Sequence, residues 1–278
     1  MAESTSHYDV IIIGAGAAGL MCAATAGYRG RKVLVVDHAD KPGKKILMSG
    51  GGRCNFTNLN STPANFLSHN PHYCISALKR YTPQDFLDLV DRHGVEHEEK
   101  APGQLFCKNS AKDILNVLLT ECEWAGAEIR MNTSVSRVQP LDSGYNLKTS
   151  RGTLSCESLV IATGGLSIPT MGATGFGYDL AKQFGLNLLP TRAGLVPFTL
   201  HAELKLQLAP LSGISCPVDA SCQKQHFREP MLVTHRGLSG PAMLQISSYW
   251  QPGDDIHINL LPAQKIQDDL FRLRNDKP

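Results

Sequence analysis

Residues 8–37 read YDVIIIGAGAAGLMCAATAGYRGRKVLVVD. The apolar run from Tyr8 to Ile13 is rich in β-branched residues and predicts a buried strand, and the alanine-rich stretch from Leu20 to Tyr28 predicts a helix. A second apolar run, Val33 to Val36, predicts another strand, which ends at Asp37. This order of strand, glycine-rich turn, helix and strand predicts the βαβ unit of a Rossmann-like fold.

The turn before the helix has the spacing G-x-G-x-x-G and consists of Gly14, Ala15, Gly16, Ala17, Ala18 and Gly19. The first glycine permits a tight turn, the second lets the main chain approach a pyrophosphate, and the third lets the helix pack closely on the strand. Asp37 would accept a hydrogen bond from a ribose hydroxyl and repel a 2′-phosphate, so the site fits FAD or NAD better than NADP. The alternative is a glycine-rich turn that binds no nucleotide.

A second glycine-rich loop follows, and residues 41–58 read KPGKKILMSGGGRCNFTN. Successive glycine N–H groups can form an anion-binding concavity, and Arg or Lys can neutralise a pyrophosphate. We expect the following residues to lie along the cofactor: Lys45, Ser49, Gly50, Gly51, Gly52, Arg53, Cys54 and Asn55. A basic surface loop is the alternative. The next cysteine after Cys54 is Cys74, so Cys54 has no resolving partner nearby, which favours packing over thiol chemistry for this residue.

The composition of the whole chain narrows the possible functions. The 278 residues carry 27 Lys and Arg against 25 Asp and Glu, a net charge of only +2. The chain lacks the basic excess typical of nucleic-acid-binding proteins, so neither DNA nor RNA is expected as a partner. The eight cysteines form no disulfide or zinc pattern, which favours a reducing, cytoplasmic compartment. Glycines interrupt the uncharged stretch from Val10 to Gly27, so neither a signal peptide nor a membrane span is expected. No metal site is expected either, because residues 93–99 lack the HExxH order.

Several stretches together resemble the BaiN-like, or YhiN-like, family of flavoproteins, to which aminoacetone oxidase is also similar. The stretches are GAGAAG (14–19), GKKILMSGGGRCNFTN (43–58), LVIATGG (159–165), IPTMGATGFGY (168–178), LVP (195–197) and THRGLSGPA (234–242). The resemblance implies an FAD-dependent oxidoreductase that transfers hydride to or from the flavin. It also implies a small organic substrate, such as an amine or an enone, and NAD(P)H or oxygen as redox partner.

The resemblance extends the predicted site to further residues. The main chain at Val135 would meet the adenine, and Thr163 and Gly164 would lie along the pyrophosphate, ribityl chain or flavin ring. His235 and Arg236 are the candidates on the substrate side, while no residue is assigned to catalysis. A flavin- or nucleotide-binding protein without turnover is the alternative function. Neither the substrate nor the oligomeric state follows from the sequence.

The rest of the chain predicts an α/β fold of the two-dinucleotide-binding type with a second, mainly β domain. Capping patterns at Thr82 to Asp85 and at Ser110 to Asp113 predict helices that end near Gly94 and Gly126. Short β-type runs at 128–138, 145–149 and 153–162 predict a β-meander inserted in the nucleotide domain.

We expect an FAD-binding domain at residues 1–192 and the start of a mainly β substrate domain at residues 193–278. The family's closing FAD-domain segment has no counterpart before Pro278, and the tail from Gln264 looks solvated. Both domains are therefore expected to be incomplete, and this form is expected to bind FAD weakly or to aggregate.

Overall fold

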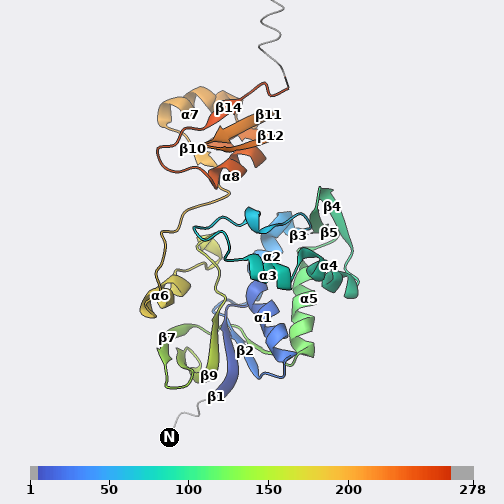
Figure 1. Ribbon diagram of the computed structural model, residues 1–278, viewed down its shortest axis with the longest axis vertical. Coiled ribbons are helices and arrows are strands. Elements are labelled where there is room, and N and C mark those ends of the chain that lie inside the picture. The colour runs from blue at the N-terminus through green and yellow to red at the C-terminus, as the bar shows by residue number, and fades with distance from the viewer. Residues whose placement is uncertain (1–5, 264–278) are drawn as a thin grey trace, which may run out of the picture. The chain divides into compact units, whose positions relative to one another are not determined.

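The computed structural model describes residues 6–263 and divides the chain into two compact units, Met1–Leu188 and Leu189–Pro278 (Figure 1). The first unit is a Rossmann-type α/β domain and the second is mainly β, which confirms the predicted fold class. The division lies close to the predicted boundary after residue 192. The predicted solvated tail, Gln264 to Pro278, lies outside the described residues.

The first unit is built on a six-stranded sheet with the order β6-β2-β1-β9-β8-β7. Its strands are β1 (Ser6–Ile13), β2 (Val33–Val36), β6 (Glu128–Arg130), β7 (Val135–Pro140), β8 (Tyr145–Thr149) and β9 (Gly152–Ile161). The pairs β6 with β2, β2 with β1, and β1 with β9 are parallel, whereas β9 with β8 and β8 with β7 are antiparallel.

The predicted meander is continuous with the parallel sheet. The run 128–138 divides into two strands, of which β6 extends the parallel part beside β2 and β7 lies at the opposite edge. Strand β9 belongs to both parts, because Leu154 faces Ser6 of β1 in parallel register and Leu147 of β8 in antiparallel register. One strand therefore joins the nucleotide fold to the meander.

Helices α4 (Pro83–Arg92) and α5 (Ala111–Trp124) begin where their capping patterns predict. The backbone N–H of Thr82 donates to Asp85 Oδ2 at 2.7 Å, and the Thr82 hydroxyl accepts from the Asp85 N–H at 3.2 Å. Ser110 and Asp113 form the same reciprocal pair at the start of α5. Each pair satisfies main-chain donors that the first turn of a helix leaves free.

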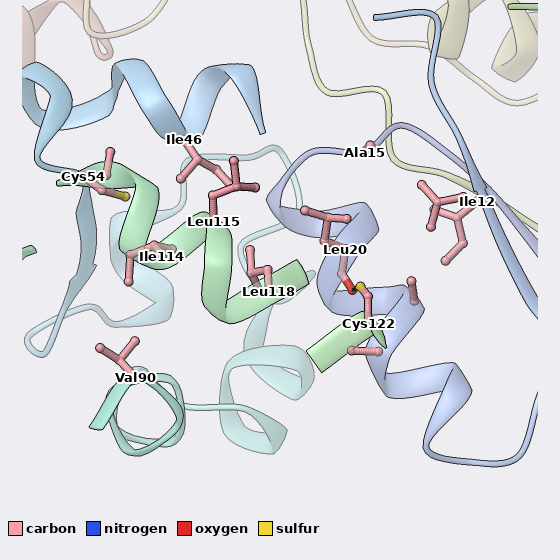
Figure 2. Close-up of a cluster of buried hydrophobic side chains, with 14 of the residues drawn as sticks. Ile12, Ala15, Leu20, Ile46, Cys54, Val90, Ile114, Leu115, Leu118 and Cys122 are labelled. Atoms are coloured by element: carbon pink, nitrogen blue, oxygen red, sulfur yellow. Dashed lines mark hydrogen bonds between the residues drawn. The ribbon is translucent and has the colours of Figure 1, made fainter. Parts of the chain in front are cut away.

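The sheet is buried on both faces by two hydrophobic clusters. Alternate residues of β1 point to opposite sides, so Ile12 joins the cluster with α1 (Ala17–Gly27) and α5, while Ile11 and Ile13 join the cluster with β7, β8 and β9. Figure 2 shows the first cluster, in which the Cys122 thiol donates to the carbonyl oxygen of Leu20 at 3.2 Å. Packing on both faces of the sheet therefore holds β1 in place, and with it the turn that follows this strand.

The remaining elements of the first unit are short. A three-stranded sheet has the order β3-β5-β4, from β3 (Asn55–Asn58), β4 (His97–Ala101) and β5 (Gln104–Cys107). The short helices are α2 (Lys44–Met48), α3 (Ile75–Arg80), α6 (Phe176–Gln183) and the 3₁₀ turns Ser49–Gly52, Pro63–Asn65 and Pro169–Met171.

The second unit contains an antiparallel sheet with the order β10-β13-β12-β11-β14. Its elements are β10 (Phe198–Thr199), α7 (Ala202–Leu208), a 3₁₀ turn (Ala209–Leu211), β11 (Ser215–Cys222), β12 (Gln225–Val233), β13 (Gly237–Ser239), α8 (Pro241–Ser247) and β14 (His257–Asn259). Helix α8 packs on this sheet through Ala242, Met243 and Ile246, which form the core of the unit. No helix within residues 6–263 is both long enough and apolar enough to cross a membrane.

Candidate functional site

The carboxyl ends of β1, β2 and β9 meet at one edge of the first unit's sheet. The N–H of Gly14 donates to the carbonyl oxygen of Val36, and the N–H of Ala162 donates to that of Ile13, both at 2.8 Å. The chain leaves β1 toward β2 on one side, and β9 lies on the other, so this edge is the switch point at which open α/β sheets bind ligands.

Two adjoining pockets open at this edge. The meander pocket, of about 400 Å³, lies against the start of β7 and includes Thr133, Ser134 and Val135. The lysine pocket, of about 650 Å³, includes Lys41, Lys44 and Lys45. The pockets share five lining residues, so they form one continuous site: Gly14, Asp37, His38, Thr163 and Gly172.

The three glycines of the first turn have different surroundings. A Cβ on Gly14 would overlap the carbonyl oxygen of Ala162, and the φ of Gly14 is +114°. A Cβ on Gly19 would overlap the carbonyl oxygen of Gly14, so helix and strand could not pack at this distance. A Cβ on Gly16 would meet no described atom within 4 Å and would project into open space. The close approach of main-chain oxygens therefore requires glycine at positions 14 and 19. At position 16 the lack of a side chain instead leaves space in the lysine pocket.

Asp37 ties the glycine turn to the end of β2. Its Oδ2 accepts the N–H of Ala15 at 2.8 Å, and its Oδ1 accepts the N–H of Ala39 at 2.8 Å. A carboxylate oxygen can accept more than one hydrogen bond, so Asp37 keeps capacity for a ligand hydroxyl at the junction of the two pockets. The predicted acid thus also positions the turn.

Lys45 reaches across the lysine pocket from α2. Its Nζ donates to Ser167 Oγ at 3.0 Å and to the carbonyl oxygen of Gly165 at 3.4 Å. Thr163 and Gly164, in the loop after β9, line the same pocket. Helix α2 is placed by Gly43, whose φ of +68° suits its turn and whose N–H donates to the carbonyl oxygen of Ala15 at 2.9 Å. A cation therefore lines the same pocket as the glycine turn.

Residues Ser49 to Asn55 lie outside the lining of both pockets. Gly50, Gly51 and Gly52 have positive φ, so the turn Ser49–Gly52 is not a regular 3₁₀ helix. The Arg53 guanidinium forms an ion pair with Glu98 at 2.9 Å and donates to the carbonyl oxygen of Lys108 at 2.7 Å. The assignment of this loop to the cofactor stays a prediction.

Cys54 is buried in the first hydrophobic cluster. It lies next to Cys107, whose N–H donates to the Cys54 carbonyl oxygen at 3.3 Å. Burial raises the pKa of the Cys54 thiol, and burial together with the nearby Cys54 raises the pKa of Cys107 to about 11. Both thiols are therefore held in the protonated form, which is a poor nucleophile.

The two candidates in the second unit lie in an exposed turn between β12 and β13. Thr234 Oγ1 accepts the N–H groups of Arg236 and Gly237 at 3.3 and 3.1 Å, which closes the turn and leaves the side chains of His235 and Arg236 exposed. Gly237 is required here, because its φ is +154° and a Cβ would overlap the carbonyl oxygen of Phe198.

Within the described residues no group of three or more His, Cys, Asp or Glu side chains could hold a metal ion. His93 and His97 have separate partners instead. His93 Nε2 lies 2.6 Å from Glu121 Oε1, and His97 Nε2 lies 2.8 Å from Asp91 Oδ1.

Several residues that line the pockets were not predicted, and His38 and Tyr178 are two of them. His38 borders both pockets, and its Nδ1 lies 3.7 Å from Asp37 Oδ1. Its Nε2 lies 2.9 Å from the point that a Cβ on Gly172 would occupy. Tyr178 of α6 lines the lysine pocket, with its hydroxyl 3.3 Å from the Cβ position of Gly165. The position of His38 directly after Asp37 is a usable signal, whereas Tyr178 reaches the pocket only through the packing of α6.

Two family models match the chain. The model described as HI0933-like protein Rossmann domain matches residues 8–216, and the model described as HI0933-like protein barrel and H2TH domain matches residues 192–278.

Among curated proteins, the chain is 55% identical to the ribosomal RNA dihydrouridine synthase of Escherichia coli over 98% of this chain and 68% of that protein. The ribosomal RNA dihydrouridine synthase of Haemophilus influenzae is 48% identical over 99% of this chain and 69% of that protein. The 3-dehydro-bile acid delta(4,6)-reductase of Clostridium scindens is 26% identical over 87% of this chain and 60% of that protein.

Among solved structures, the open conformation of a flavocytochrome c3 fumarate reductase aligns with a TM-score of 0.49 and 20% identity, over 78% of this chain and 48% of that one.

Proposed function

Because this chain belongs to the HI0933-like protein family, we propose that it is an FAD-dependent oxidoreductase that reduces a carbon–carbon double bond conjugated to a carbonyl group. We further propose that the double bond is that of a uracil base in ribosomal RNA. The cofactor assignment rests on the site and the family, the conjugated double bond rests on the chemistry that the relatives' names share, and the RNA base rests on the two relatives named as dihydrouridine synthases.

The continuous site at the strand ends is the observation that carries the cofactor assignment. A dinucleotide is long, and the meander and lysine pockets together extend from Val135 past Asp37 and Gly16 to Lys45. Gly16 leaves a space that a Cβ would fill, at the N-terminus of α1, where helix N–H groups favour a phosphate. The residues present therefore fit FAD.

In this arrangement each group has a distinct task. Asp37 accepts a ribose hydroxyl, the main chain at Val135 borders the adenine, and the N-terminus of α1 binds the pyrophosphate. Lys45 adds positive charge in the lysine pocket, and Thr163 with Gly164 lines the cofactor beside it. FAD, when bound, supplies hydride acceptance and donation.

The substrate class follows from what the curated relatives' names have in common. Dihydrouridine is uridine whose C5–C6 double bond, conjugated to the C4 carbonyl, has been reduced. A bile-acid reductase named for positions 4 and 6 of a 3-oxo compound also reduces double bonds conjugated to a carbonyl. The relative with 55% identity favours the RNA base, so an RNA partner replaces the sequence-based expectation of none.

The test begins with the visible spectrum of the purified protein, in which bound oxidised flavin is detected directly. The flavin is then reduced anaerobically with NAD(P)H and mixed with protein-free ribosomal RNA. We expect reoxidation and a gain of two hydrogen atoms in a uridine nucleoside, measured by mass spectrometry of the digested RNA. A small cyclic enone serves as the parallel substrate.

The alternatives give different results in the same experiment. Reoxidation by the enone but not by RNA would support a small-molecule reductase, which the bile-acid reductase likeness favours. A bound flavin that neither substrate reoxidises would instead support a flavin-binding protein without turnover. A colourless folded protein with no extractable flavin would contradict the FAD assignment.

A further inference from the structure

One segment of the first unit carries an unusual charge. From Lys41 to Gln84 the chain contains no Asp or Glu. The same segment contains six cations: Lys41, Lys44, Lys45, Arg53, Lys79 and Arg80. Since the whole chain has 27 Lys and Arg against 25 acids, all of its positive excess lies in this segment. The near-zero total conceals a strongly basic part.

The structure neutralises only some of these charges. Lys44 pairs with Asp40 at 2.7 Å and Arg53 pairs with Glu98 at 2.9 Å. Within residues 6–263, Arg80 has no carboxylate partner, and neither do Arg29 and Arg31 of the loop between α1 and β2. Unpaired guanidinium groups favour an external anion.

These three arginines line one pocket, here called the arginine pocket, of about 760 Å³. Tyr81 lies beside them, no acidic residue lines the pocket, and its wall is a face of α1 that runs from Ala18 to Ala26. Ala18 also lines the lysine pocket, so the two pockets adjoin at the N-terminus of α1. The arginines lie beyond the other end of this face, about 12 Å along the helix axis.

Exposed aromatic rings follow the same segment. Phe66 is 40% exposed, Tyr73 54% and Tyr81 40%. Tyr73 precedes α3 and Tyr81 follows it, and this six-residue helix is about 9 Å long. Guanidinium groups interleaved with exposed rings are the combination that binds a phosphate backbone and stacks unpaired bases.

We propose that residues 41–84, together with Arg29 and Arg31, form the surface that binds single-stranded parts of the ribosomal RNA substrate. The arginine pocket binds backbone phosphates, and the rings stack on unpaired bases. This inference rests on the proposed function, since it adds the RNA contact surface to a site that reduces an RNA base. The surface leads along α1 to the lysine pocket, next to the bound cofactor.

The test compares two triple variants of the chain with the same loss of charge. Arg29→Gln/Arg31→Gln/Arg80→Gln removes the arginine pocket's cations, and the control Arg137→Gln/Arg151→Gln/Lys182→Gln removes exposed cations elsewhere in the first unit. The dissociation constant for protein-free ribosomal RNA is measured over a range of KCl concentrations. Flavin content and reduction of a small enone report folding, because none of the six substituted residues lines the meander or lysine pocket.

The arginine-pocket variant is expected to bind RNA at least about tenfold more weakly at 0.15 M salt, and the slope of log affinity against log salt is expected to fall by about 2, the value for three single-strand phosphate contacts. The control variant should keep the wild-type slope. Tyr73→Ala should weaken binding by about 5- to 150-fold with the slope unchanged, because stacking is not ionic.

Three results would overturn the inference while leaving the proposed function intact. The first is an arginine-pocket variant that binds RNA like the wild type. The second is a control variant that loses as much affinity, which would show that the net charge of the molecule, and not the arginine pocket, determines RNA binding. The third is an unchanged RNA affinity with a raised KM for NADPH, which would assign the arginines to a nucleotide donor. A wild-type protein that reduces the enone but neither binds nor reduces RNA would instead overturn the RNA substrate itself, and this inference with it.

Discussion

The glycines of the first turn illustrate how one motif combines two kinds of constraint. Gly14 and Gly19 are needed by the protein, because neighbouring main-chain oxygens occupy the space of a side chain. Gly16 has no such neighbour among the described residues, and under the proposed function it is the bound cofactor that requires the space. Substitutions at the two kinds of position should therefore fail in different ways.

Gly16→Val should abolish FAD binding with little change in the thermal stability of the apoprotein, since the new side chain enters the lysine pocket. Gly19→Ala should lower the stability of the apoprotein by about 1 to 3 kcal/mol or more, because it overpacks the contact between α1 and β1. Thermal unfolding and flavin titration of both apoproteins distinguish these effects. A strongly destabilised Gly16→Val variant would contradict the open space at this residue.

Cys54→Ser should leave flavin content and turnover largely unchanged, because the buried thiol contacts Ser49 and other packing atoms outside both pockets. Since burial raises its pKa, the rate of Cys54 alkylation should still be rising with pH above the ordinary thiol pKa. Mass spectrometry after timed alkylation measures this rate. Loss of turnover with FAD still bound would return Cys54 to the chemistry of the site.

At the scale of single elements, Glu121 of α5 holds three helix ends together. It is 4% exposed and accepts hydrogen bonds from Arg92 at 2.7 Å and from the Tyr28 hydroxyl at 2.9 Å, and it contacts His93 at 2.6 Å. Burial alone would raise the pKa of Glu121, but these hydrogen bonds together hold it below its ordinary value. The ionised carboxylate therefore stabilises the fold.

The sign of the pH effect follows from this lowered pKa. The contribution of Glu121 is complete above the ordinary carboxyl pKa of about 4.3 and is lost as the pH falls through the lower folded-state pKa. Glu121→Gln should thus be less stable than the wild type at pH 7, and the difference should narrow below about pH 4. Urea unfolding followed by tryptophan fluorescence reports it, because Trp124 stacks on His93. A constant difference from pH 7 to pH 3 would contradict this role.

Helices α4 and α5 and the first βαβ unit could be predicted from local sequence, because a cap at Thr82 or Ser110 acts within a few residues. The dual pairing of β9 could not, since it depends on partners far away in the chain. The orientation of the Arg53 side chain could not be predicted either, because its partners Glu98, in β4, and Lys108, directly after β5, are distant in the sequence. The basic segment 41–84 could have been recognised from its missing acids, but the charge balance of the whole chain conceals it.

At the scale of the whole molecule, each unit has its own hydrophobic core. The clusters on both faces of the first sheet contain only residues of the first unit, and the α8 cluster contains only residues of the second. The stretch between α6 and β10 contains no helix or strand. This separation predicts that the connection can be cut without unfolding either core.

Brief trypsin treatment should cut first after Arg192, an exposed residue in this connection. Because the meander and lysine pockets are lined by residues of the first unit, a flavin bound there should stay with the N-terminal fragment. Mass spectrometry identifies the cut, and size-exclusion chromatography with absorbance detection locates the flavin. Release of the flavin on cleavage would indicate that the second unit helps to retain it.

The pairing of β1 with β9 also determines when the sheet can be completed during synthesis of the chain. His7 and Ser155, which face each other in these strands, are 148 positions apart, so at 5 to 20 residues per second β9 leaves the ribosome on the order of 7 to 30 s after β1. During that interval one edge of β1 has no partner, and the wall that carries Thr163 does not exist. We therefore expect flavin to bind late in the synthesis of each molecule. The appearance of bound flavin on a nascent chain would mark the time at which β9 pairs with β1.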